Sequence, residues 1–106
     1  MNVFFWRRPV VDGVRLTPAS ERVLRVPLTS APGLTVAAIG SRAGVKTRTV
    51  SRLLVRLQVR SWVLSAWESL PPGADRPRRR FYRLTPYGRT RTLRLLGAYD
   101  TPGGRP

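Results

Sequence analysis

The sequence contains no cysteine and no histidine. The absence of cysteine excludes disulfide bonds and thiol nucleophiles, and the absence of histidine removes the commonest general base and zinc ligand. The five acidic residues are scattered along the chain, so no paired carboxylates of the kind used in acid–base catalysis can be recognised. No phosphate-binding glycine loop and no nucleophile with a neighbouring base is present either. We therefore predict that the protein is not an enzyme and uses no metal or other cofactor.

Long apolar segments are also missing. An aromatic run at residues 3–6 is followed directly by Arg7, Arg8 and Pro9. Such a run is too short to span a membrane, and its flanks do not fit a signal peptide. We expect a cytoplasmic protein that does not associate with membranes.

Acidic residues are few in comparison with basic ones. The chain has 20 Lys and Arg against 5 Asp and Glu, which gives a net charge of +15. A small domain with this charge repels itself unless a polyanion neutralises it, so nucleic acid is the first partner to consider. All but one of the basic residues are arginine, whose planar donor fork suits phosphate groups and guanine edges. A GC-rich coding bias would also favour arginine over lysine, but it does not explain the shortage of acids.

Two Thr-Pro pairs mark the starts of helices. Thr17-Pro18 and Thr85-Pro86 each combine an N-cap residue with a proline at the first helical position. They predict helices that run to about residue 30 and about residue 98, with Pro27 kinking or ending the first of them. A chain of 106 residues supports one domain. We predict an N-terminal arm at residues 1–15, the folded domain at 16–98 and a disordered tail at 99–106.

The middle of the chain predicts two helices joined by a tight turn. Thr35 caps a helix at 36–42, and Gly44 suits the positive φ at its end. The next helix, at 46–60, is amphipathic, because its apolar residues recur at i, i+3, i+4 and i+7: Val50, Leu53, Leu54 and Leu57. A rotation of about 100° per residue places a polar, basic set on the opposite face and its flanks: Thr47, Arg48, Ser51, Arg52, Val55, Arg56 and Val59.

A β-hairpin and a last helix complete the predicted domain. Residues 61–68 are rich in aromatic and β-branched side chains and predict a strand, and 80–84 predict the return strand. The loop between them contains three prolines and is basic. Glu68, at the end of the first strand, is expected to pair with an arginine of this loop, and Trp62 and Trp67 are expected to pack in the core or the hairpin. The fold class is mainly α with a small antiparallel β-hairpin (α+β), in the order of a winged helix-turn-helix.

Several segments of this pattern resemble the PadR-like family of winged-helix transcriptional regulators, over residues 16–96. The resemblance rests on Gly44-Val45, Thr49–Leu54, Trp62-Val63, Trp67-Glu68 and Arg78–Arg89. It implies a sequence-specific double-stranded DNA-binding regulator, a repressor, whose helix 46–60 enters the major groove. The loop at 69–80, the wing, would touch the DNA backbone or the minor groove. No residue pattern points to a small-molecule effector.

The resemblance also implies which residues contact DNA. The predicted contacts from the helix are Lys46, Thr47, Arg48, Ser51, Arg52, Val55 and Arg56, and those from the wing are Arg76, Arg78, Arg79 and Arg80. Arg48, Ser51 and Arg52 are expected to contact bases, because an Arg paired with guanine discriminates by about 1–3 kcal/mol. Val55 is expected to meet a thymine methyl group, and Lys46 and Thr47 are expected to meet phosphates. The alternative is that the basic helix face is only solvated.

Exposed apolar residues near the two ends predict a homodimer. Leu93 and Leu96 are expected to face the core, which leaves Leu95 and Tyr99 on the opposite side of the last helix, in water. The predicted two-fold interface consists of Phe4, Phe5, Trp6, Leu95 and Tyr99. Two alternative functions stay open: an architectural or RNA-binding accessory protein without sequence preference, and a winged helix used only for protein contacts. The net charge argues against the second.

Overall fold

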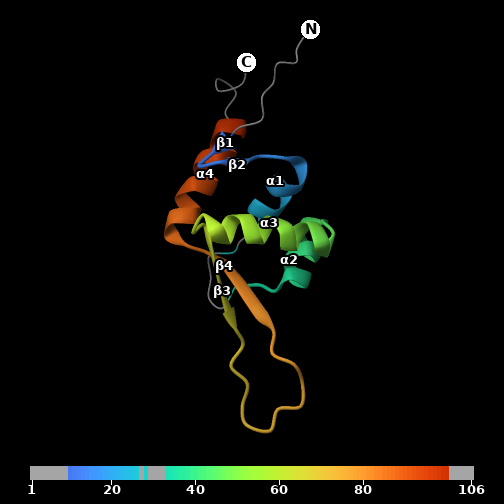
Figure 1. The fold of residues 1–106 in the computed structure, drawn as a ribbon. Coiled ribbons are helices and arrows are strands. Elements are labelled where there is room, and N and C mark those ends of the chain that lie inside the picture. Colours follow the sequence, from blue (N-terminus) through green and yellow to red (C-terminus); the bar gives the residue numbers. More distant parts are fainter. Residues whose placement is uncertain (1–9, 27, 29–32, 101–106) are drawn as a thin grey trace.

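The computed structural model describes residues 10–26, 28 and 33–100. Figure 1 shows helix α3 crossing the middle of the molecule, with one β-hairpin on each side of it. The core between these elements is apolar, and its largest fully buried side chain is Trp62. The elements in chain order are β1 (Val10–Val11), β2 (Val14–Arg15), α1 (Pro18–Leu24), α2 (Val36–Ala43), α3 (Thr47–Val59), β3 (Val63–Trp67), β4 (Arg80–Leu84) and α4 (Pro86–Asp100).

Residues 10–15 form a hairpin, β1–β2, where the sequence predicts only an arm. Val10 pairs with Arg15 and Val11 with Val14. The turn residues Asp12 and Gly13 have φ angles of 55° and 80°, and an Asp-Gly pair adopts this conformation readily. Val14 belongs to the core. The folded body therefore begins earlier than residue 16.

The β1–β2 hairpin is held in place through Asp12. Its carboxylate accepts hydrogen bonds from Trp62 Nε1 at 3.2 Å and from the Tyr87 hydroxyl at 2.9 Å. Its backbone carbonyl accepts one from Arg60 Nε at 3.0 Å. The hydrogen bond from Trp62, followed by that from Tyr87, lowers the pKa of Asp12 below its ordinary value, because both favour the charged carboxylate. The turn is thereby joined to the end of α3 and the start of α4.

Helix α1 is shorter than predicted. It begins after Thr17, whose hydroxyl accepts from the Ser20 backbone N–H at 3.1 Å, while Ser20 Oγ accepts from the Thr17 N–H at 2.6 Å. This reciprocal pair satisfies two of the free donors at the helix start. The helix ends at Leu24, with Arg25 as C-cap, and not near residue 30. Pro27 explains the early end, because proline has no N–H to donate and disfavours helical backbone in the residue before it.

The two helices after it form the predicted helix-turn-helix. The Thr35 hydroxyl caps α2 by accepting from the Ala38 N–H at 3.2 Å. Gly44 ends α2 with φ 69°, a left-handed conformation that favours glycine. Lys46 is the N-cap of α3, and its side chain makes no capping hydrogen bond. The bounds of both helices agree closely with the sequence prediction.

The β3–β4 hairpin extends away from the body as a long wing (Figure 1). Its register runs from the pair Val63 and Leu84 to the pair Trp67 and Arg80, and both strands agree with the prediction. On the outer side of β4, Leu34 adds a short bridge: its N–H donates to the Tyr82 carbonyl at 2.9 Å, and the Tyr82 N–H donates back at 2.8 Å. The wing is thus tied to the loop before α2.

The predicted orientation of α4 is wrong. Leu96 packs against the core as expected. Leu95, however, is fully buried and Leu93 is 57 % exposed, the reverse of the expectation for these two residues, so Leu95 cannot serve as a dimer contact. The cause is Gly88, which packs so closely on Trp62 that a Cβ would overlap the Trp62 carbonyl oxygen. This contact sets the rotation of α4, and Leu95, seven residues later, lies on the same inward face.

The other predicted dimer residues are not placed. Phe4, Phe5 and Trp6 lie outside the described residues, as does the side chain of Tyr99. Helix α4 continues to Asp100, beyond the predicted end near residue 98. Among the helices of the described segments, none combines the length and apolar character needed to cross a membrane.

Candidate nucleic-acid interface

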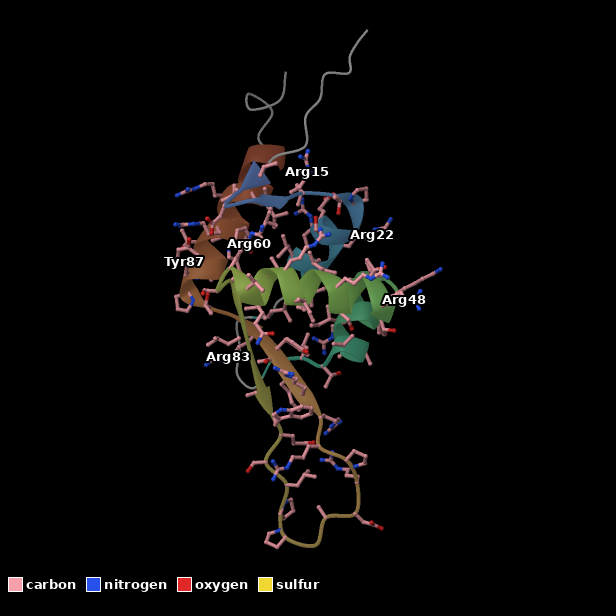
Figure 2. All side chains as sticks on the ribbon, in the orientation of Figure 1. Arg15, Arg22, Arg48, Arg60, Arg83 and Tyr87 are labelled. Carbon is pink, nitrogen blue, oxygen red and sulfur yellow. The ribbon has the colours of Figure 1, made fainter. Side chains whose placement is uncertain are left out.

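The outer face of α3 is polar, basic and accessible. Val50, Leu54 and Leu57 are buried and Leu53 is partly buried, which fixes the rotation of the helix as predicted. The opposite face is therefore turned to solvent, and in Figure 2 Arg48 extends away from the body at the start of α3. The predicted helix contacts are all exposed: Lys46, Thr47, Arg48, Ser51, Arg52, Val55 and Arg56.

The charge of this face is of one sign. Residues 36–67 contain no aspartate or glutamate. Arg48, Arg52, Arg56 and Arg60 are spaced four residues apart, so they follow one row that turns slowly around α3. Like charges at this spacing repel one another. A polyanion bound along the row would relieve this repulsion.

The start of α3 adds a partial positive charge. The first turn contains no acidic residue, and the N-cap side chain makes no hydrogen bond to it. The first N–H groups of a helix have no partner within the helix, and together with the helix dipole they attract anions. Lys46 and Thr47 lie at this end, where the sequence analysis predicts phosphate contacts.

The wing presents Arg80 on an aromatic surface. Because Trp67 pairs with Arg80 and Ser65 with Tyr82, the four side chains share one face of the hairpin. The Arg80 guanidinium carbon lies 5.3 Å from the ring centroid of Trp67 and 5.9 Å from that of Tyr82, within the range of cation–π attraction. Its Nε and Nη2 donate to Ser65 Oγ at 3.0 and 2.7 Å. Arg80 is thereby held in an exposed position.

A hydrogen bond links this wing face to α3. Gln58 Nε2 donates to Ser65 Oγ at 3.1 Å, so a residue of α3 and Arg80 of the wing share one hydroxyl group. The basic face of α3 and the aromatic face of the wing are therefore adjacent. Trp67 was not predicted to be part of this surface: Trp62 is buried as expected, but Trp67 is 59 % exposed. Its position opposite Arg80 in the register was the available signal.

Two of the wing arginines share one carboxylate, so the group that they form with Glu68 keeps one net positive charge. Arg76 Nη1 and Nη2 donate to Glu68 Oε1 and Oε2, both at 2.7 Å, and Arg79 Nη2 donates to Oε2 at 3.0 Å. The hydrogen bonds from Arg76 and then Arg79 hold the pKa of Glu68 far below its ordinary value, and the same pair raises the pKa of Arg76. The predicted pairing of Glu68 with a wing arginine is confirmed. Within the described part of the chain, Arg78 has no ion-pair partner.

Comparisons with known proteins point to the same architecture. No protein-family model matches the sequence, and no curated protein matches it. The crystal structure of the MarR family transcriptional regulator SPO1453 from Silicibacter pomeroyi DSS-3 is similar, with a TM-score of 0.54 and 20 % sequence identity. The match covers 79 % of this chain and 54 % of that one, so this chain spans about half the length of that regulator. The chain has the winged helix-turn-helix fold, mainly α with a small antiparallel hairpin, that its sequence predicts.

Proposed function

We propose that this protein is a transcriptional regulator that binds specific sequences of double-stranded DNA. The observation that carries the proposal is the outer face of α3, which is exposed, basic and free of acidic residues. Its inner face is fixed by Val50, Leu54 and Leu57, which are buried. A helix fits the major groove of DNA, which is about 12 Å wide. The body of the protein thus holds α3 in a position from which it can enter the groove.

Each group on α3 is assigned a contact by its chemistry. Arg48, Ser51 and Arg52 contact base edges, because arginine pairs with guanine through two hydrogen bonds and serine accepts several partners. Val55, which is 62 % exposed, meets a thymine methyl group. The remaining predicted helix contacts, Lys46, Thr47 and Arg56, position the helix on phosphates.

The wing contributes contacts to the backbone or the minor groove. Arg80 is held on Trp67 and Tyr82 with its guanidinium exposed, and Arg78 extends from the loop without an ion-pair partner among the described residues. Arg76 and Arg79, also predicted to contact DNA, are bound to Glu68. We assign to them the shaping of the loop that presents the other two.

The sequence resemblance supports a finer assignment, in which the protein is a PadR-like repressor. The apolar residues predicted near the two ends of the chain support the further proposal that it acts as a homodimer. Its two α3 helices occupy half-sites about one turn of DNA, roughly 34 Å, apart. In this assignment the bound protein blocks access to the DNA that it covers.

The test is the selection of duplex fragments by the purified protein from a random pool. Selected fragments should share a motif with two half-sites, and they should outcompete a scrambled duplex of the same composition. Arg52→Ala should reduce discrimination at one base pair by about 1–3 kcal/mol, whereas Arg94→Ala, an exposed arginine of α4, should not. If scrambled DNA competes equally and Arg52→Ala weakens every duplex to the same extent, the protein is a binder without sequence preference and the proposal fails.

A further inference from the structure

A basic cavity lies beside α3, next to the β1–β2 hairpin. It has a volume of about 230 Å³ and is lined by residues of the hairpin, the start of α1, and one flank and the end of α3. Three of its lining side chains are arginines, and none of its described lining residues is acidic: Arg15, Arg56 and Arg60. Residues separated by about forty positions in the sequence are thus brought together around one space.

Arg60 is held in position before any ligand binds. Its Nε donates to the Asp12 carbonyl at 3.0 Å, and its Nη1 donates to the Arg56 carbonyl at 3.4 Å. The guanidinium also packs beside Gly13, where a Cβ would lie 3.1 Å from Nε and Nη2. A guanidinium has five N–H donors, so two hydrogen bonds leave three donors. An arginine that is already ordered loses less conformational entropy on binding.

The cavity keeps an excess of positive charge. Asp12 interacts electrostatically with Arg60, but its carboxylate is hydrogen-bonded to Trp62 and Tyr87. Glu21 of α1 is engaged by Arg25, with Nε and Oε2 3.0 Å apart. Of the three cavity arginines, Arg60 alone therefore interacts with a carboxylate among the described residues. This surplus, together with free N–H donors, suits a phosphate group.

The position of the cavity relative to α3 identifies the source of that phosphate. Figure 1 shows the wing on one side of α3 and the β1–β2 hairpin on the other, and Figure 2 shows Arg15 and Arg60 on the hairpin side. A helix in the major groove is bordered by two sugar–phosphate backbones. The row of arginines along α3 also leads from Arg48 to this cavity, and no wing residue lines it.

We propose that this cavity binds a backbone phosphate of the duplex, on the strand that borders the major groove opposite the wing. The inference rests on the proposed function and adds to it a phosphate contact on the hairpin side of α3. Phosphates on both sides of α3 would then fix the depth and angle of the helix in the groove. Because a phosphate contact carries no sequence information, the cavity contributes affinity and position to binding.

The test compares Arg15→Gln/Arg60→Gln with the control Arg94→Gln, in which an exposed arginine of α4 that does not line the cavity is changed. Binding of the selected duplex is measured by fluorescence anisotropy at several salt concentrations. Loss of one phosphate contact should make the negative slope of log K against log salt concentration shallower by about 0.9, and it should weaken binding to all duplexes equally. The control removes one positive charge and the double variant removes two. The control should keep a steeper dependence of log K on log salt concentration than the double variant. If Arg15→Gln/Arg60→Gln unfolds like the wild type and its slope of log K against log salt concentration is unchanged, the inference is overturned.

Neutral phosphate analogues distinguish a DNA phosphate from a free anion. Single methylphosphonate substitutions along the duplex should weaken wild-type binding at one flanking position, and that position should no longer matter in Arg15→Gln/Arg60→Gln. If inorganic phosphate binds the cavity while no substitution affects the variant differently from the wild type, the site holds a free anion and the inference fails. Arg52→Ala, measured in parallel, reports on the proposed function: if it alters base discrimination while the cavity variant behaves like the wild type, only the inference about the cavity fails.

Discussion

Replacing Glu68 with glutamine is expected to release two arginines of the wing. Glu68 binds Arg76 through both carboxylate oxygens at 2.7 Å and also binds Arg79 at 3.0 Å. Glutamine has nearly the same shape but no charge, so it cannot hold two guanidinium groups in this way. The freed arginines would become available to DNA phosphates. We expect tighter binding to duplexes of any sequence at low salt and a smaller advantage of the selected site.

The size of the effect follows from the number of guanidinium groups released. Each additional phosphate contact steepens the dependence of log K on log salt concentration by about 0.9, so two contacts add about 1.8. Between 50 and 200 mM salt this corresponds to an additional loss of affinity of roughly tenfold. Fluorescence anisotropy with the selected duplex and a scrambled one measures both the slope and the specificity ratio.

Asp75→Asn supplies the matched control. Asp75 lies in the same loop, and its loss changes the net charge by the same amount, but within the described residues it forms no ion pair. Its slope should stay close to that of the wild type. A slope for Glu68→Gln that is unchanged, or that shifts no more than the slope of Asp75→Asn, would show that the two arginines are not withheld from DNA by Glu68.

The remaining predictions concern the stability of the fold. Leu95→Ala should lower the free energy of unfolding by about 2–5 kcal/mol, and Leu93→Ala by less than about 0.5 kcal/mol, in urea denaturation; equal effects would contradict the placement of α4. Ser61→Gly should raise it by about 1 kcal/mol, because Ser61 has φ 64° in the left-handed position that follows α3, and a loss of stability would refute this. The lowered pKa of Asp12 means that its contribution is complete above the ordinary value of 3.8 and is lost only as the pH falls through the lower folded value. Asp12→Asn should therefore remove part of the pH dependence of unfolding below pH 3.8, and an identical acid denaturation profile would disprove that role.

The elements of the domain were largely predictable from local signals. The apolar spacing of Val50, Leu54 and Leu57 determined both the existence of α3 and the face that it buries. Thr35 and Gly44 marked the ends of α2 because a cap hydroxyl and a left-handed glycine act within a few residues. The exposed basic face of α3 follows directly from that spacing.

The N-terminal hairpin was not predictable in the same way. Its strands have two residues each, too few to show an alternating pattern, and the Asp12-Gly13 pair was the only local signal. The hairpin is stabilised by hydrogen bonds from Trp62 and Tyr87 to Asp12. These partners lie 50 and 75 residues away, and no local pattern indicates such contacts.

Composition and periodicity are local properties, and they were enough to predict the order of the central elements, the outward face of α3 and the cationic character of the protein. The rotation of α4 came instead from packing, where contact between Gly88 and Trp62 turned Leu95 inward. Packing also decided which arginines remain available: Glu68 binds Arg76, and the hairpin places other arginines around a cavity. Both outcomes depend on distances between segments that are remote in the chain, and such distances exist only once the core has packed.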